Sequence, residues 1–332
     1  MRYAVATLRL RQEMSYDYLL LALGSETNYF GMTLVAARGA TMKTLGDAAL
    51  LRNRMVALLE DAAAEIDEAA RRRLMTFVVA GGGFAGVETV GAMNDFLRET
   101  LRDYPELDPS MLRGVLVHSG NIVLPELGER LGRYAQEKLK RRGVEVRLGV
   151  RVSGYDDWVV KLSTGEPIVA NTLVWTVGVR PAAAVESLSV EKVNGRLKVS
   201  QYLELAGHEG VVWAVGDCAA VPDGHGGYTR PRRSMACGLA AAENIWAAVN
   251  GGAPKPFRFS TIGQLASIGH HTGVAQVLGM RFSGFVAWWL WRSVYLAKLP
   301  GIANKVRVAI QWMLDLLFSR QIEQFLTLTK NI

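Results

Sequence analysis

The chain has 332 residues, half of them hydrophobic, with 38 Lys and Arg against 31 Asp and Glu and a formal net charge of +7. This length and composition exclude a disordered polymer and allow one large core or two. The basic excess favours anionic partners, and the candidates are nucleotides, nucleic acid and an anionic membrane. Cys218 and Cys237 lie 19 residues apart, a spacing that indicates neither a disulfide framework nor a metal site.

The first 73 residues predict two strands and a helix. Residues 1–11 alternate between apolar and polar as a strand does, and residues 18–24 are an apolar run that ends at Gly24. Residues 48–73 predict a charged amphipathic helix. The start of the chain lacks the apolar core of a signal peptide, and no stretch reaches the roughly 18 apolar residues that span a bilayer. We therefore expect a cytoplasmic protein.

An apolar run followed by Gly-x-Gly-x-x-Gly is the most specific motif. The run at 77–80 predicts a buried strand, and the motif, at 81–86, opens a predicted helix. Gly81 permits a tight turn, Gly83 lets the backbone approach a pyrophosphate, and Gly86 lets helix and strand pack closely. We interpret the motif as a dinucleotide-binding turn. A glycine turn without a ligand is the alternative.

A complete βαβαβ series follows from this turn. Its further predicted elements are a helix over 84–102, a strand over 114–118, a helix over 126–142, a strand over 144–148, a hairpin around 163–165 and a strand over 172–175. The second strand ends in His118, where dinucleotide sites commonly place an Asp or Glu that accepts from the ribose 2′-OH. Glu106 and Asp108 lie between two prolines in a predicted loop and do not supply it. This position therefore does not indicate whether the ligand carries a 2′-phosphate.

A later apolar strand, residues 211–217, ends in Gly216 and Asp217. An Asp at the carboxyl end of a buried strand lies in the crevice where α/β sheets bind ligands. We interpret Asp217 as an acceptor of hydrogen bonds from a ligand polyol. The alternative is the N-cap of a following helix.

Residues 281–320 concentrate aromatic and basic side chains. They contain six Lys or Arg against one Asp, and four of the eight tryptophans. Residues 303–319 place apolar and polar side chains on different faces, as an amphipathic helix requires. Tryptophans and cations on a helix too short to span a bilayer are typical of an interfacial anchor. Single-stranded nucleic acid and a core or dimer-contact helix are the alternatives, and the unbroken apolar run 285–291 favours lipid.

Four segments resemble, in order and spacing, the type II NADH dehydrogenases, which are single-subunit, membrane-peripheral NADH:quinone oxidoreductases that use FAD. The segments are 21–31, 81–88, 174–181 and 213–217. The resemblance implies an α/β protein with two Rossmann-like dinucleotide-binding domains, the NADH domain inserted in the FAD domain, and C-terminal amphipathic membrane-anchoring helices. It also implies a homodimer, peripheral to the cytoplasmic face of the cell membrane.

Two departures from that family stand out. No Gly-x-Gly-x-x-Gly precedes residue 24, so we expect the FAD domain to be N-terminally incomplete, without its first βαβ unit. At 232–237, where the family carries an Ala-Gln motif beside the flavin and quinone, Ala236 alone is retained. The expected domains are a partial FAD-binding domain (1–73), an NADH-binding domain (74–180), a second FAD-binding segment (181–255) and a membrane-anchoring region (256–332).

The resemblance also implies site residues. Gly81, Gly83 and Gly86 would hold the NADH pyrophosphate, and Gly178 would lie near the nicotinamide. Glu88 matches a family glutamate near the nicotinamide and quinone and is the catalytic candidate; a structural carboxylate in the first helical turn is the alternative. We expect the positive helix end to keep Glu88 ionised.

On the flavin side, Asp217 would accept from the ribityl chain. Gly24 and Gly216 would allow close approach of the flavin, with Ala236 nearby. No metal is expected.

The resemblance thus implies a flavoenzyme that passes hydride from NADH to FAD and electrons to a membrane quinone, with a lipid partner at 281–320 and no nucleic acid. Sulfide:quinone oxidoreductases and disulfide reductases share the architecture but use a redox cysteine pair, which the spacing here does not offer. A membrane-associated NAD(H)-binding protein without flavin or catalysis is the alternative from another class.

Overall fold

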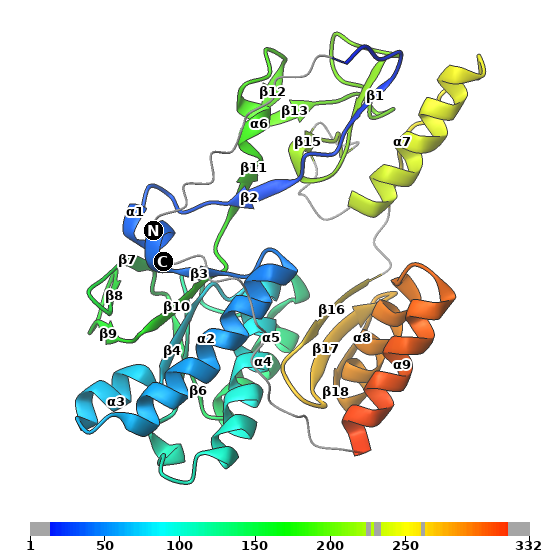
Figure 1. Ribbon diagram of the computed structural model, residues 1–332. Coiled ribbons are helices and arrows are strands. Elements are labelled where there is room, and N and C mark those ends of the chain that lie inside the picture. The colour runs from blue at the N-terminus through cyan, green and yellow to red at the C-terminus, as the bar shows by residue number, and fades with distance from the viewer. Residues whose placement is uncertain (1–13, 224–226, 229–233, 260–262, 318–332) are drawn as a thin grey trace, which may run out of the picture. The chain divides into compact units, whose positions relative to one another are not determined.

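The computed structural model describes residues 14–223, 227–228, 234–259 and 263–317, which form two compact units (Figure 1). Unit 1 contains the described residues up to Glu26 and those from Val179 to 259, and unit 2 contains Thr27–Gly178 and 263–317. The predicted strand over residues 1–11 lies outside the described residues.

Unit 2 is built on a five-stranded parallel sheet of order β3-β10-β4-β5-β6. The strands are β3 (Ala40–Thr41), β10 (Thr172–Trp175), β4 (Thr76–Ala80), β5 (Arg113–His118) and β6 (Val144–Leu148). All residues of β4 and β10 are buried, as expected for central strands covered on both faces. The strands predicted at 77–80, 114–118, 144–148 and 172–175 are confirmed to within one residue.

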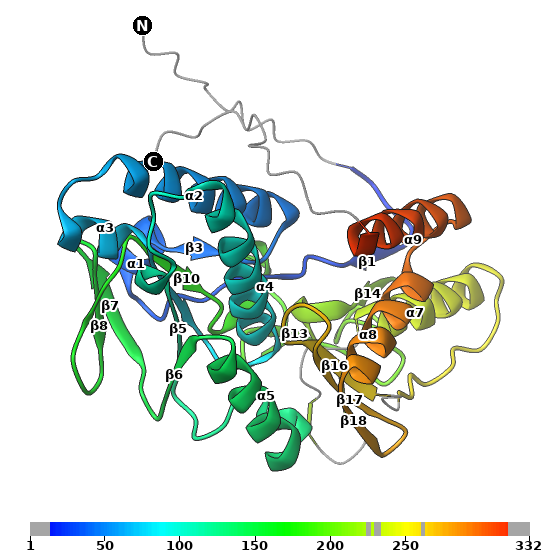
Figure 2. The same ribbon diagram turned by 90° about the horizontal axis from the view of Figure 1, so that it is seen from below.

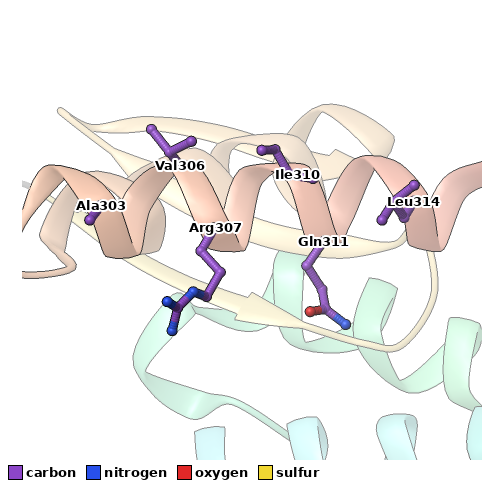
Figure 3. Close-up of a pocket in the computed structure, with 6 residues that line it drawn as sticks. All are labelled: Ala303, Val306, Arg307, Ile310, Gln311 and Leu314. Atoms are coloured by element: carbon purple, nitrogen blue, oxygen red, sulfur yellow. The ribbon is translucent and has the colours of Figure 1, made fainter.

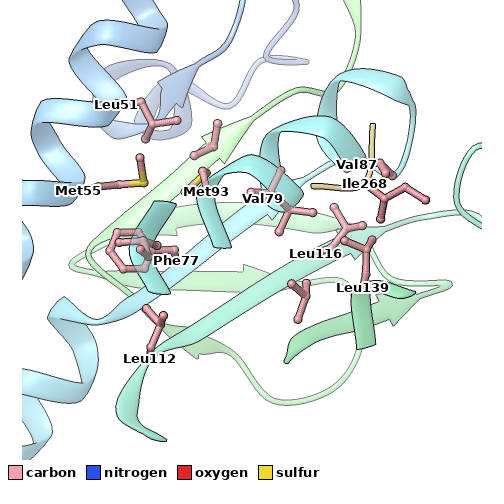
Figure 4. Close-up of a cluster of buried hydrophobic side chains, with 14 of the residues drawn as sticks. Leu51, Met55, Phe77, Val79, Val87, Met93, Leu112, Leu116, Leu139 and Ile268 are labelled. Atoms are coloured by element: carbon pink, nitrogen blue, oxygen red, sulfur yellow. The ribbon is translucent and has the colours of Figure 1, made fainter. Parts of the chain in front are cut away.

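Most of the helices cover one face of this sheet, and the helix at Thr33–Arg38 covers the other face together with a small antiparallel sheet. The helical elements of this part of unit 2 are α1 (Thr33–Arg38), α2 (Leu45–Ala64), α3 (Glu68–Leu74), α4 (Phe84–Thr100), η1 (Leu101–Asp103), η2 (Pro109–Met111), η3 (Pro125–Leu127) and α5 (Glu129–Arg141). The small sheet is β7 (Val152–Asp156), β8 (Val159–Leu162) and β9 (Ile168–Val169). Figure 4 shows Leu51 and Met55 of α2 beside Phe77 of β4 and Met93 of α4, in one buried cluster.

The helix predicted over 48–73 is wrong as a single element. Thr44 caps the start of α2 in a reciprocal capping box with Asp47, and α2 ends at Ala64. Asp67 then caps α3, its side chain accepting from Ala70 N at 2.9 Å. A second N-cap inside a helical pattern ends one helix and starts another.

The C-terminal residues of unit 2 form a hairpin sheet followed by two helices. The elements are β16 (Gly263–Ser267), β17 (Gly273–Val277), β18 (Met280–Gly284), α8 (Phe285–Lys298) and α9 (Ile302–Leu317). Ile268 and Val274 join the core cluster of α4 and α5, and in both views α4 lies between the central sheet and this hairpin sheet (Figures 1 and 2).

Unit 1 has its own core around Trp213. Strands β1 (Leu19–Leu21) and β14 (Val212–Ala214) pair in parallel. The remaining elements are β2 (Ser25–Thr27), β11 (Val179–Pro181), α6 (Ala183–Glu186), β12 (Lys192–Val193), β13 (Arg196–Lys198), η4 (Gly216–Cys218), β15 (Ala219–Ala220) and α7 (Ser234–Val249).

The compact units divide the chain differently from the four expected domains. Residues 27–73 belong to unit 2, because β3 extends the central sheet and one face of α2 packs into its core. The C-terminal residues also belong to unit 2. The functional division into domains stays a prediction.

No helix in the described part of the chain is both long and apolar enough to cross a membrane.

Candidate functional site

The glycine motif forms the turn between β4 and α4. Gly81 has φ +113°, and a Cβ on Gly86 would lie 1.7 Å from the Gly81 carbonyl oxygen. Thr176 Oγ1 donates to the Ala80 carbonyl at 2.6 Å and braces the strand end. Side chains therefore cannot be tolerated at 81 or 86 without displacing the backbone.

The open position of the turn is Gly83, the N-cap of α4. It makes no side-chain cap, and a Cβ there would meet nothing within 4 Å. The first N–H groups of a helix lack partners within the helix and favour an anion. This geometry suits a pyrophosphate, and the pyrophosphate site itself stays a prediction.

His118, at the end of β5, turns its ring onto this glycine turn. Its Nδ1 accepts from Gly82 N at 3.1 Å. Burial lowers its pKa, against the opposing effects of the Ile122 backbone and the Glu126 carboxylate. The sequence shows that the acid is absent but has no local signal for this contact.

Gly178 packs against a segment far away in the sequence. It has φ +72°, and an added Cβ would lie 2.6 Å from Phe30 Cζ. Asn28 N donates to Gly178 O at 3.3 Å, and Trp175 Nε1 donates to Asn28 O at 2.9 Å. Two of the four segments that carry the family resemblance therefore meet here.

Glu88 is the fifth residue of α4, not a first-turn residue. Its Oε1 accepts from Ser267 N at 3.1 Å and from Trp291 Nε1 at 3.0 Å. Burial raises the pKa of Glu88, and these two hydrogen bonds oppose the rise in part. The pKa shift of Glu88 runs opposite to the one that the positive helix end would produce, because the residue lies beyond the first turn and under the C-terminal hairpin.

Three positions on one face of α4 hold the C-terminal hairpin. Glu88 accepts a hydrogen bond from Ser267 N. Asp95, two helical turns further along, accepts one from His270 N at 2.5 Å. Between them a Cβ on Gly91 would lie 2.8 Å from the Ile268 carbonyl carbon, so glycine permits the contact. The helix that starts at the glycine turn thus also carries the C-terminal residues. Sequence analysis missed Ser267 and Trp291, since partners 179 and 203 residues away leave no local signal.

In unit 1, Asp217 and Ser25 lie together at the carboxyl ends of two parallel strands. Ser25 Oγ donates to Asp217 Oδ2 at 2.5 Å. Gly24 and Gly216, one residue before each, have φ +68° and +76°. Asp217 lies within η4, whose N-cap is Val215, so the N-cap alternative for Asp217 is wrong. Ser25 was missed as a site residue although it directly follows Gly24.

The remaining predicted residues are placed as follows. Ala236 lies in the first turn of α7 and is half-buried. Cys218 and Cys237 are both buried and form no disulfide, and Cys218 Sγ lies 3.2 Å from the Val215 carbonyl oxygen. Among the described residues, no group of three or more His, Cys, Asp or Glu could hold a metal ion.

The fold and the sites can be compared with known protein families. Residues 4–242 match the family model described as pyridine nucleotide-disulphide oxidoreductase, and residues 262–321 match the NDH2 C-terminal domain. The chain belongs to the pyridine nucleotide-disulphide oxidoreductase family. Within it, the C-terminal match and the relatives below make the chain a type II NADH dehydrogenase.

Two relatives cover most of the chain. The probable NADH dehydrogenase of Dictyostelium discoideum is 31% identical over 94% of this chain and 70% of its own length. The type II NADH:quinone oxidoreductase Ndh of Mycobacterium tuberculosis is 32% identical over 92% of this chain and 68% of its own length. The solved structure of NDH2 from Plasmodium falciparum in complex with NADH shares the fold, with a TM-score of 0.84 at 18% identity, covering 93% of this chain and 80% of that one.

Proposed function

We propose that the protein is a flavin-dependent NADH:quinone oxidoreductase. The observation that carries the proposal is α4, which has an open dinucleotide turn at its N-terminus and, one turn later, a half-buried carboxylate under the NDH2 C-terminal domain. NADH and FAD supply the hydride and electron transfer when bound. The chain's own residues bind and orient these cofactors and transfer protons.

The turn at 81–86 fits the NADH pyrophosphate. Gly83 leaves open space at a helix N-terminus that no side chain caps, and Gly81 and Gly86 accept no Cβ. Because helix N–H groups bind phosphate without needing a cation, this fit depends on the backbone alone. Gly178, braced by Asn28, would border the nicotinamide.

Unit 1 fits the polyol of a flavin. Asp217 and Ser25 present a carboxylate and a hydroxyl where β14 and β1 end, and the left-handed Gly24 and Gly216 keep side chains away from that edge. Carboxylate and hydroxyl oxygens are the natural partners of ribityl hydroxyls. Ala236, in α7, would lie on the flavin side as the family match suggests.

Glu88 is proposed as the proton carrier for quinone reduction. Its Oε1 accepts two N–H groups, so the acid proton resides on Oε2. Burial raises the pKa of Glu88 above its ordinary value, so the side chain holds a proton more readily than an exposed glutamate. Reducing a quinone to a quinol consumes protons, which such a group delivers.

The C-terminal helices are proposed to dock on an anionic membrane. The Arg292 guanidinium lies 4.5 Å from the ring centroid of Trp288 and 4.4 Å from that of Trp312, and this cation–π contact fastens α9 to α8. Apolar side chains of α9 then face outward: Ile302, Val306, Ile310, Met313 and Leu314. Figure 3 shows Val306 and Ile310 on one side of α9, with Arg307 and Gln311 directed to the other, along a mostly apolar surface depression. An apolar stripe flanked by cations suits the membrane interface.

By family membership we also propose a homodimer at the cytoplasmic face of the cell membrane. Light scattering in detergent tests the dimer, since it reports twice the chain mass if the proposal holds.

Colour and turnover test the main proposal. The purified protein should be yellow from bound flavin and should oxidise NADH with a soluble quinone analogue. A colourless preparation that still binds NADH and stays inactive after added FAD would favour the alternative, an NAD(H)-binding protein without catalysis. Loss of both NADH binding and flavin would reject the dinucleotide interpretation altogether.

A further inference from the structure

The residue in the ribose-reading position of the dinucleotide site is a histidine. His118 ends β5, the second strand of the βαβ unit, one residue beyond the pairing of Val117 with Ala80. In dinucleotide folds this position commonly holds an acid that accepts from the ribose 2′-OH and disfavours a 2′-phosphate. What the His118 ring presents therefore bears on which dinucleotide binds.

The His118 ring is held against the glycine turn. Nδ1 accepts from Gly82 N at 3.1 Å, and the ring also bonds to the Ile122 backbone. A Cβ on Gly82 would lie 2.5 Å from His118 Cγ, and one on Gly120 would lie 2.8 Å from Nε2. The ring is thus packed between two glycines, and it forms its hydrogen bonds with backbone groups.

The charge at this strand end is also unusual. Burial lowers the pKa of His118, which favours the neutral ring. The residues that follow, Ser119 and Asn121, are exposed and uncharged. Glu126 is the acid that acts on the ring, and one of its carboxylate oxygens is fully buried. The strand end therefore offers hydroxyl and amide donors where a carboxylate is usual.

Building on the proposed function, we propose that this site accepts NADPH as well as NADH. A 2′-phosphate meets no carboxylate at residues 118–122, and the neutral side chains of Ser119 and Asn121 can donate to it. His118 determines whether a 2′-phosphate is tolerated. It occupies the position where an acid would disfavour that phosphate, and its ring bonds to the glycine turn instead.

Direct binding measures the tolerance without requiring flavin or turnover. Isothermal titration calorimetry of the full chain with NADH and with NADPH gives two dissociation constants. We expect NADPH to bind less than about tenfold more weakly than NADH. A ratio of about tenfold or more overturns the proposal.

Two variants introduce a carboxylate at the end of β5. His118→Glu and Ser119→Glu should each raise the NADPH-to-NADH ratio of dissociation constants at least about tenfold, by weakening NADPH. Ser119→Glu keeps the His118 contact with Gly82 and so tests the idea even if His118→Glu does not fold. Thr164→Glu, which adds the same charge on the exposed β8–β9 turn, should leave the ratio unchanged. An unchanged ratio in Ser119→Glu, or an equal rise in Thr164→Glu, contradicts the role of this strand end.

The outcomes separate this inference from the proposed function. If the wild-type chain binds NADH but rejects NADPH, the inference fails and the oxidoreductase proposal stands. If it binds neither dinucleotide, the proposed function fails as well.

Discussion

Individual residues at this site act through the backbone groups they meet. Gly86 is required because its Cβ would overlap the Gly81 carbonyl, whereas Gly83 has free space around it. These two glycines of one motif thus serve different ends, one structural and one for ligand access. Substitution should separate the two roles.

Gly83→Ala should weaken NADH binding at least about tenfold while leaving the free energy of unfolding within about 0.5 kcal/mol of wild type. The added methyl enters the space where the pyrophosphate is expected and touches no protein atom. Calorimetric titration with NADH and urea unfolding measure the two effects. Gly46→Ala, in the first turn of α2, is the matched control. Equal NADH affinity in both variants would show that Gly83 does not border the cofactor.

Glu88→Gln should lower NADH:quinone turnover by roughly 10²-fold, the usual range for losing a general acid. Gln keeps an oxygen that accepts from Ser267 and Trp291, so the fold should persist. Burial places the folded pKa of Glu88 above its ordinary value of 4.5. Wild-type turnover should therefore fall as pH rises through that raised pKa, and the variant should lose this limb of the pH profile.

Glu99→Gln, on the same helix, is the control for that experiment. A Glu88→Gln enzyme with wild-type turnover and an unchanged pH profile would leave Glu88 with the purely structural role of holding the hairpin.

At the scale of elements, α4 and α9 carry the function proposed here. The N-terminus of α4 forms the turn, and its face holds the β16–β17 hairpin through Glu88, Gly91 and Asp95. Asp95 also accepts two bonds from Arg142 Nη1, at 2.7 and 2.8 Å, and Arg142 Nη2 donates to the His270 carbonyl oxygen, so the C-terminus of α5 is tied to the same hairpin. A charge-assisted contact of this kind is stronger than a neutral hydrogen bond, so the hairpin is firmly attached to the nucleotide-binding sheet.

The exposed stripe of α9 should bind lipid. Ile310→Glu should reduce binding to vesicles that contain phosphatidylglycerol at least about tenfold, because a carboxylate replaces a side chain that inserts among lipid tails. Gln311→Glu introduces the same charge on the polar flank and should change binding less than about threefold. Vesicle flotation measures both variants. Equal flotation of the two proteins would indicate that the stripe faces a protein partner.

At the scale of the whole molecule, two units with separate cores imply two different changes in stability when a ligand binds. The cluster around Phe77 and the cluster around Tyr155 lie in unit 2, and the cluster around Trp213 lies in unit 1. A ligand stabilises the part of a protein that it binds by RT ln(1 + [L]/Kd).

NADH at about 100 times its Kd should therefore add up to about 2.7 kcal/mol of protection to amides of β4, β5 and α4. Amides of β1 and β14 should gain much less. Hydrogen exchange followed by mass spectrometry, with and without NADH, gives the comparison. Uniform protection of both units would show that they unfold as one.

The sequence by itself determined the central sheet, the glycine turn and the family. Strands such as 77–80 and 172–175 are apolar runs whose burial follows from their own side chains, and Gly-x-Gly-x-x-Gly is a local steric requirement. The tertiary structure alone decided the partners of these residues. Glu88 meets Trp291, Asp217 meets Ser25, and His118 turns onto Gly82, each across 36 or more residues. Sequence periodicity describes which face of an element is apolar, but it does not specify which distant polar group that element meets, and it is this meeting that sets the charge and hydrogen bonding of the site.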